Sequence, residues 1–284
     1  MIYISSACFK HQKIKDSVSQ LANAGFLNIE LTGGTKYYDG FEQDLLELKD
    51  KYNLNYLCHN YFPPPKTPFV VNIASLNDDV YQNSIDHFKS AINLSKQLGA
   101  KKFGFHAGFL IDIKVHEIGK PITKELLQNK EKSFDRFCTA FNLLKDASDD
   151  INLYIENNVI SETNYKTYNG ENFLMLTNYQ NYLELVERLD FNLLLDVAHL
   201  KVSSRVLNLD FKTEISNMLG KSDYLHISDN DGLHDLNYGM TKDSELFKIL
   251  ANFDLSQKDF TLEVYSGLSA LEDSFNAVTE LLTV

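Results

Sequence analysis

The sequence has few cysteines and no long apolar runs, and both shortages argue against whole classes of protein. Its three cysteines, Cys8, Cys58 and Cys138, are far apart and form no CxxC pair. This argues against a disulfide framework or a zinc–thiolate cluster, and we expect small buried thiols in a reducing cytoplasm. No apolar run approaches the roughly 20 residues of a membrane span. The first ten residues lack the basic and apolar segments of a signal peptide.

Arginine is scarce as well. Of 27 basic residues only three are arginine, and the net charge is −12. Proteins that bind nucleic acids normally present a basic face, because phosphate contacts dominate their affinity. The charge balance therefore argues against nucleic acid and against an anionic membrane surface as partners. It leaves a small molecule as the expected ligand.

Apolar runs rich in β-forming residues alternate with stretches of helical periodicity along the whole chain. The runs that predict strands are 2–6, 27–31, 55–59, 102–106, 152–156, 192–196, 223–227 and 260–264. The stretches that predict helices are 14–25, 41–52, 77–100, 131–148, 178–189, 208–219, 243–252 and 269–282. Eight strands alternating with eight helices predict a (β/α)₈ barrel, an α/β fold.

The predicted barrel forms one domain over residues 1–284, because no linker or composition break divides the chain. Hydrophobic residues make up 44% of the sequence, which is enough for a sizeable core. A doubly wound open sheet is the alternative fold. The segment after the first predicted strand lacks a GxGxxG loop, which argues against a dinucleotide-binding version of that alternative.

Seven of the eight predicted strands end in, or carry near their end, a carboxylate or an imidazole. These residues are Glu30, His59, His106, Glu156, Asp196, His226 and Glu263. The carboxyl ends of barrel strands meet at one mouth, so these groups are expected to surround a common centre. A buried carboxylate is costly unless it is paired. Carboxylate oxygen and imidazole nitrogen are ligands of Zn²⁺, Mn²⁺, Co²⁺ and Fe²⁺, so the ring predicts a site for a divalent metal ion.

Four ordered motifs carry a family resemblance. They are "YIENN" (154–158), "LLLDVAHLK" (193–201), "YLHISDNDG" (224–232) and "FTLEV" (260–264), and "CHNYFPP" and "FGFHAG" add weaker support. With them the chain resembles the xylose isomerase-like TIM barrel superfamily over essentially its whole length. That superfamily includes sugar and sugar-phosphate isomerases and epimerases, inosose dehydratases, and zinc-dependent abasic-site endonucleases.

The resemblance implies specific roles for individual residues. One divalent ion (Mn, Zn, Co, Fe or Mg) would be held by Glu156, Asp196, His226 and Glu263. Glu156 and Glu263 would also move the substrate proton. The candidates for contact with the substrate are His59, His106, Glu162, His199, Lys201 and Arg205. Of these, Lys201 and Arg205 are expected in the loop after the sixth strand, where they would bind an anionic group or form a solvated pair. Three other histidines, His11, His87 and His116, are expected on the surface.

The resemblance leaves the reaction open. The endonuclease branch usually carries an Asp-x-His pair after the seventh strand, and here Asp235 and Asn237 stand in its place. Together with the scarcity of arginine, this favours an isomerase or epimerase that acts on a sugar or sugar derivative through an enediolate. An abasic-site endonuclease and an inosose dehydratase-like lyase are the alternatives. A homo-oligomer is compatible with the sequence, because barrels of this kind often pair, and residues 157–177 are long enough to form a lid.

Overall fold

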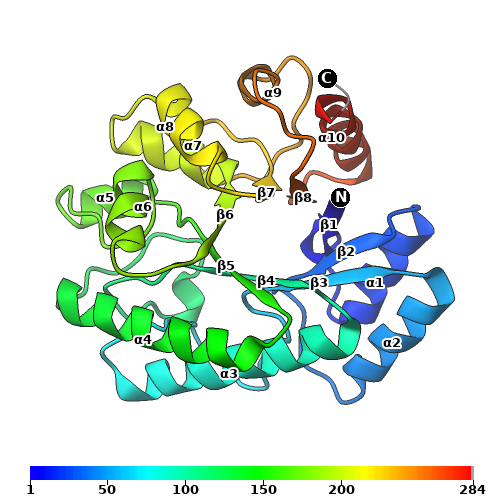
Figure 1. Cartoon of the computed structure of the whole chain (residues 1–284), viewed down its shortest axis with the longest axis horizontal. Helices are drawn as coiled ribbons and strands as arrows, with labels where there is room; N and C mark the ends of the chain where they lie inside the picture. The colour runs from blue at the N-terminus through cyan, green and yellow to red at the C-terminus, as the bar shows by residue number, and fades with distance from the viewer. Residues whose placement is uncertain (283–284) are drawn as a thin grey trace.

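In a computed structural model, described here for residues 1–282, eight parallel strands close into a barrel (Figure 1). The strands are β1 (Ile2–Ser5), β2 (Asn28–Leu31), β3 (Asn55–His59), β4 (Lys102–His106), β5 (Asn152–Glu156), β6 (Asn192–Asp196), β7 (Tyr224–Ile227) and β8 (Asp259–Leu262). Each strand pairs with its neighbour in chain order, and β1 pairs with β8. The predicted (β/α)₈ barrel is therefore confirmed.

Helices surround the barrel on its outer side (Figure 1). They are α1 (Ile14–Asn23), α2 (Phe41–Tyr52), α3 (Asp78–Leu98), α4 (Lys130–Ser148), α5 (Glu162–Thr167), α6 (Tyr179–Val186), α7 (Val197–Val206), α8 (Phe211–Leu219), α9 (Glu245–Leu250) and α10 (Leu268–Leu281), with short 3₁₀ turns η1 (Ser6–Cys8) and η2 (Val115–Glu117). Within the described residues, no helix is both long enough and apolar enough to cross a bilayer.

The core has an outer and an inner part. The outer part lies between strands and helices, where residues such as Phe88, Phe103 and Phe105 are fully buried. The inner part fills the barrel and consists of Tyr3, Leu57, Ala100, Tyr154, Leu194 and Tyr224. Because both faces of each strand are buried, the strands are continuous apolar runs rather than alternating ones.

The structure corrects two expectations drawn from the sequence. Lys201 and Arg205 lie on α7, not in a loop. His87 lies in α3 and is only 7% exposed, with its Nε2 3.1 Å from the carbonyl oxygen of Asn60. The three cysteines are free, and Cys8 and Cys58 are buried, as expected.

Candidate metal centre

The strand register brings the polar strand-end residues to one level of the barrel. His106 pairs with Glu156 between β4 and β5, and Asp196 pairs with His226 between β6 and β7. Glu263 follows β8 directly, and its backbone N–H donates to the carbonyl oxygen of Ile227 on β7. Neighbouring strands that end together therefore place these five functional groups around one centre.

Three of the expected metal ligands, Asp196, His226 and Glu263, offer donor atoms that all lie within 4.8 Å of one another. The fourth, Glu156, places its Oε1 3.3 Å from Nδ1 of His226. Two atoms of this group, Asp196 Oδ2 and His226 Nδ1, are buried and have no hydrogen-bond partner. Buried polar atoms normally have a partner, and a cation bound by these lone pairs would supply it. The donor set therefore fits a divalent metal ion.

Glu156 is the hub of the cluster. Its Oε2 lies 2.7 Å from Nε2 of His59 and 3.3 Å from Nδ1 of His106. It also belongs to two further groups with cation-binding geometry, one with His59 and His226 and one with His106 and His199. Burial alone would raise the pKa of Glu156, but the surrounding imidazoles outweigh burial and hold this pKa well below its ordinary value.

The other two carboxylates of the group behave in the opposite way. Burial, reinforced by the nearby charge of Glu156, raises the pKa of Glu263 to about 7. Burial also raises the pKa of Asp196 to about 6, and Glu156 acts in the same direction. In the absence of a cation, the centre thus holds one firmly ionised carboxylate beside two that retain their protons to higher pH.

His226 is supported from behind by a carboxylate that belongs to none of the four expected ligands. Its Nε2 lies 3.1 Å from Oε1 and 3.4 Å from Oε2 of Glu30, which is fully buried. Oε2 of Glu30 also accepts hydrogen bonds from the hydroxyls of Tyr224 and Thr261. A carboxylate on Nε2 keeps the proton there and leaves the Nδ1 lone pair directed at the cluster. The sequence analysis placed Glu30 in the ring but assigned it no role.

His199 stands beside the cluster at the start of α7. Its backbone N–H donates to Asp196 Oδ1 at 2.7 Å, so Asp196 caps the helix that carries His199. Its Nδ1 is 2.9 Å from the carbonyl oxygen of Asn157, and its Nε2 is 3.4 Å from Oδ2 of Asp235. Asp235 is thus part of the site, whereas the side chain of Asn237 donates to Ser228.

Three residues expected to contact substrate are paired elsewhere. Glu162 is exposed, and its Oε1 lies 2.7 Å from Nζ of Lys166. The Lys201 Nζ is buried and donates to Asp229 Oδ1 at 2.7 Å and to the carbonyl oxygen of Asn230 at 2.8 Å. Arg205 donates to the exposed Glu245 at 2.8 Å. By contrast, His59, His106 and His199 all lie at the centre.

A cavity of about 580 Å³ opens beside the centre and meets it at His106, His199 and Asp235. Its walls come from the segments that follow β3, β4 and β5 and from the loop after β7, including Tyr61 and Leu236. The mouth formed by the carboxyl ends of the strands is where barrel enzymes bind their substrates.

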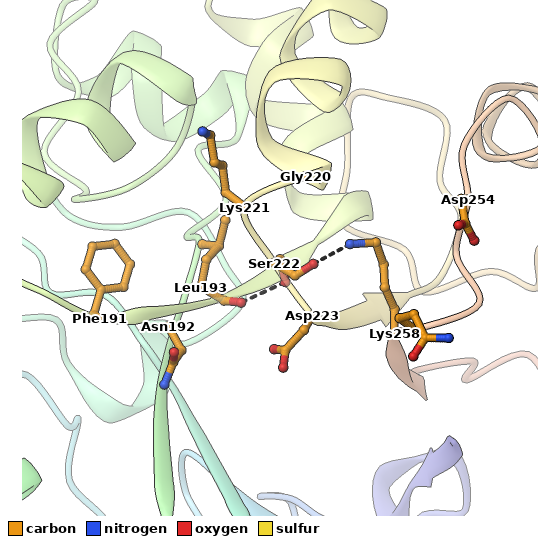
Figure 2. A pocket seen from close by; sticks show the side chains of 10 residues that line it. Phe191, Asn192, Leu193, Gly220, Lys221, Ser222, Asp223, Asp254 and Lys258 are labelled. Atoms are coloured by element: carbon orange, nitrogen blue, oxygen red, sulfur yellow. Dashed lines mark hydrogen bonds between the residues drawn. The ribbon is translucent and has the colours of Figure 1, made fainter.

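A second cavity, of about 350 Å³, lies at the opposite end of the barrel, where β6, β7 and β8 begin (Figure 2). Figure 2 shows Ser222 between the two groups it contacts. Its hydroxyl donates to the carbonyl oxygen of Leu193 at 2.7 Å, and its own carbonyl oxygen accepts from Lys258 at 2.5 Å. Lys258 also donates to the carbonyl oxygen of Leu219, the last residue of α8. These bonds hold the turn before β7, which is a structural role.

A family model described as "Xylose isomerase-like TIM barrel" matches residues 18–281. The chain belongs to this family. The match spans the ends of β2 to β8, from which the residues of the centre come. A comparison with curated proteins finds no match to this sequence.

Solved structures of the same architecture include enzymes of two kinds. A D-tagatose 3-epimerase-like protein has a TM-score of 0.72 at 15% identity, covering 99% of this chain and 97% of its own. D-psicose 3-epimerase, solved in the presence of D-fructose, has a TM-score of 0.65 at 16% identity, covering 100% and 99%. Endonuclease IV from Thermus thermophilus has a TM-score of 0.59 at 12% identity, covering 98% and 99%. At these identities the likeness establishes the fold and leaves the reaction open.

Proposed function

We propose that the protein is a divalent-metal-dependent isomerase or epimerase that acts on a sugar or sugar derivative. The observation that carries the proposal is the pair of buried atoms without a hydrogen-bond partner, Asp196 Oδ2 and His226 Nδ1. They lie in one group with Glu263, and Glu156 adjoins it. These four side chains are the ones that would hold the metal. The sugar epimerases among the solved structures of this fold support the same interpretation.

The chemistry follows from the two glutamates. A bound divalent ion would supply stabilisation of the negative charge that develops on the carbonyl and hydroxyl oxygens of the sugar. Glu156 would take the proton from the carbon between those oxygens, and Glu263 would return a proton, so that the reaction passes through an enediolate.

A second candidate is a metal-dependent phosphodiesterase that acts at abasic DNA. Two observations favour it: His59 and His106 both contact Glu156, and His199 lies beside Asp235, so the site has room for more than one ion. Against it stand Asn237 and the net charge of −12 with only three arginines, because binding DNA requires several phosphate contacts.

Metal content separates the two candidates. We would measure divalent ions per chain by elemental analysis on the native protein, on Asp196→Ala, and on the exposed control Glu162→Gln. About one ion per chain, lost only in Asp196→Ala, supports the sugar enzyme. About three ions per chain with binding to abasic duplex DNA supports the phosphodiesterase. No ion in any sample after reconstitution contradicts both.

The proton transfer is tested without knowing the product. Ketoses, aldoses and inososes incubated with the metal-loaded protein in D₂O will acquire deuterium at the carbon that loses its proton, which NMR detects. Glu156→Gln, checked for retained metal, is expected to lower this exchange by about 10²-fold or more, the usual contribution of a general base. Full exchange in a metal-loaded Glu156→Gln protein would remove Glu156 from the mechanism.

A further inference from the structure

The cavity beside the metal centre is asymmetric. At its inner end lie the imidazoles of His106 and His199, whose rings stack with centroids 5.6 Å apart. Its outer part extends over the loops that follow β3 and β4 and over the segment after β5, away from the four expected ligands. A ligand that is larger than the inner end would therefore extend from the metal centre into this outer part.

The outer wall is mainly apolar. It includes Val70, Phe109, Ile113, Ile118, Ile122 and Leu174. Ile118 is 46% exposed, although it is a large aliphatic side chain that lines a concave surface. A free sugar, which presents hydroxyls on every side, leaves such a wall without a matching partner, because apolar surface gains free energy only when apolar groups cover it.

The charges around the cavity do not suit an anion. Among the described residues that line it, Lys120 is the single lysine or arginine, and it is exposed. The imidazoles are those of His106 and His199 at the inner end and that of His234, whose Nδ1 lies 2.9 Å from Oδ2 of Asp231. The carboxylate of Glu117 already accepts from the backbone of Lys114 and from Thr123, and Asp235 adds a second negative group. A phosphate is normally held by several cationic or N–H donors, and this wall does not gather them.

We infer that the substrate is an uncharged sugar that carries an apolar substituent, with the sugar at the metal centre and the substituent against Ile118, Ile122 and Leu174. The inference rests on the proposed function, because it takes the metal centre as the place where the sugar reacts. It excludes sugar phosphates as the preferred class. Asn60, which follows His59 directly in the chain, also lines the cavity and would contact the sugar portion.

Binding of three probes to the Mn²⁺-loaded protein tests this inference. Phenyl β-D-glucopyranoside is expected to bind at least about tenfold more tightly than methyl β-D-glucopyranoside, since one methylene in an apolar pocket already gives about tenfold. Glucose 6-phosphate is expected to bind no more tightly than the methyl glucoside. Isothermal titration calorimetry gives the three affinities, and Mn²⁺ is expected to relax the sugar protons in NMR more strongly than the phenyl protons.

A matched pair of variants locates the apolar portion. Ile118→Asp places a charge on the cavity wall and is expected to reduce the preference for the phenyl glucoside below about twofold. Leu126→Asp makes the same change in the same loop at a side chain that is 94% exposed and does not line the cavity, so it is expected to leave the preference unchanged.

Either of two results overturns the inference: equal affinity for the phenyl and methyl glucosides, or tighter binding of glucose 6-phosphate than of either. Both results are compatible with a metal-dependent sugar enzyme. Failure of the proposed function would be seen separately, as a chain that binds no divalent ion. The comparison of the two glucosides can still be made with the metal-free protein in that case.

Discussion

Asp196 serves two purposes with its two oxygens. Oδ1 accepts from the backbone N–H of His199 and caps α7, while Oδ2 has no hydrogen-bond partner and faces the cluster. The cap fixes the carboxylate in one rotamer, because the helix start holds Oδ1 in place. The cost of placing a carboxylate at the end of a buried strand is thus partly offset by the helix that this residue begins.

Glu30 leads to a prediction about metal affinity. Glu30→Gln keeps the shape of the side chain but removes the charge that orients His226, and we expect affinity for Mn²⁺ or Zn²⁺ to fall by about 10–100-fold, the usual effect of losing such a partner. A competition titration against a chromophoric chelator measures the affinity. In the metal-free protein Glu30 is one of the carboxylates that raise the pKa of His226, so this pKa is expected to fall in Glu30→Gln, as followed by the ¹⁵N shifts of His226 against pH.

The control for this prediction is Glu162→Gln, which removes an exposed carboxylate that is paired with Lys166. It is expected to leave both the affinity and the His226 shifts unaltered. If Glu30→Gln binds metal as tightly as the native protein and leaves the pKa of His226 unchanged, Glu30 only fills space in the barrel.

At the scale of elements, two helices, α5 and α7, lie outside the segments that the sequence predicts as helical, and α7 is the one that carries His199. Every residue from Val197 to Ser204 is buried, including His199 and Lys201. A helix covered on all sides has no polar face, so its apolar positions do not recur at helical spacing. The segment 197–206 therefore lacks the pattern that identified the amphipathic helices α1, α2 and α3.

The lysine inside α7 leads to a prediction about stability. Lys201 is 4% exposed and pairs with Asp229, which is 9% exposed, in the loop after β7. Lys201→Met leaves the Asp229 charge buried without its partner, and we expect a loss of about 3–5 kcal/mol in the free energy of unfolding. Urea denaturation measures it. The double variant K201M/D229N is expected to recover most of the loss.

Arg205, one turn further along α7, is the matched control. Its ion pair with Glu245 is exposed, so Arg205→Ala is expected to lower the free energy of unfolding by less than about 1 kcal/mol. If Lys201→Met and Arg205→Ala lower the free energy of unfolding equally, the buried Lys201–Asp229 pair contributes no more to stability than the exposed pair.

At the scale of the whole molecule, the buried cluster makes stability depend on pH. In the metal-free protein the pKa of Glu263 is raised to about 7, and burial raises that of Asp196 to about 6, against roughly 4.3 and 3.9 for unfolded side chains. Burial lowers the pKa of His226, but Glu30 and Glu156 outweigh it and raise this pKa well above its ordinary value. Each of these groups binds protons more tightly when folded.

The direction in which stability changes with pH follows from these pKa shifts. Groups with a raised pKa contribute stability that is complete at low pH and is lost as the pH rises through the folded pKa. The lowered pKa of Glu156 acts only below about pH 4.3, and His106, lowered to about 4 chiefly by burial, is neutral in both states above about pH 6.5. Burial lowers the pKa values of His199 and His59, but neighbouring carboxylates outweigh it and raise both, so these groups act in the same direction as His226. The metal-free protein is therefore expected to lose at least about 2 kcal/mol of stability from about pH 6.5 to about pH 8.

Urea denaturation of protein treated with a chelator measures this loss, and Glu263→Gln is expected to reduce it. Divalent metal acts in the opposite direction, because its ligands must be deprotonated and it binds more tightly at higher pH. The gain in Tm on adding metal is thus expected to increase from about pH 6.5 to about pH 8. A metal-free protein that becomes more stable over this range would contradict the assignment of protons in the cluster.

The sequence by itself determined the fold and the composition of the centre. Parallel strands need helical crossovers, and eight such units close into a barrel whose strand ends converge, so a polar residue at each strand end already predicts the ring. Only the tertiary structure decided which of those residues contact one another. Glu30 and His226 lie 3.1 Å apart across a sequence separation of 196 residues, and four separate segments build the cavity wall. Such contacts depend on side-chain packing between distant elements, which leaves no periodic pattern in the chain.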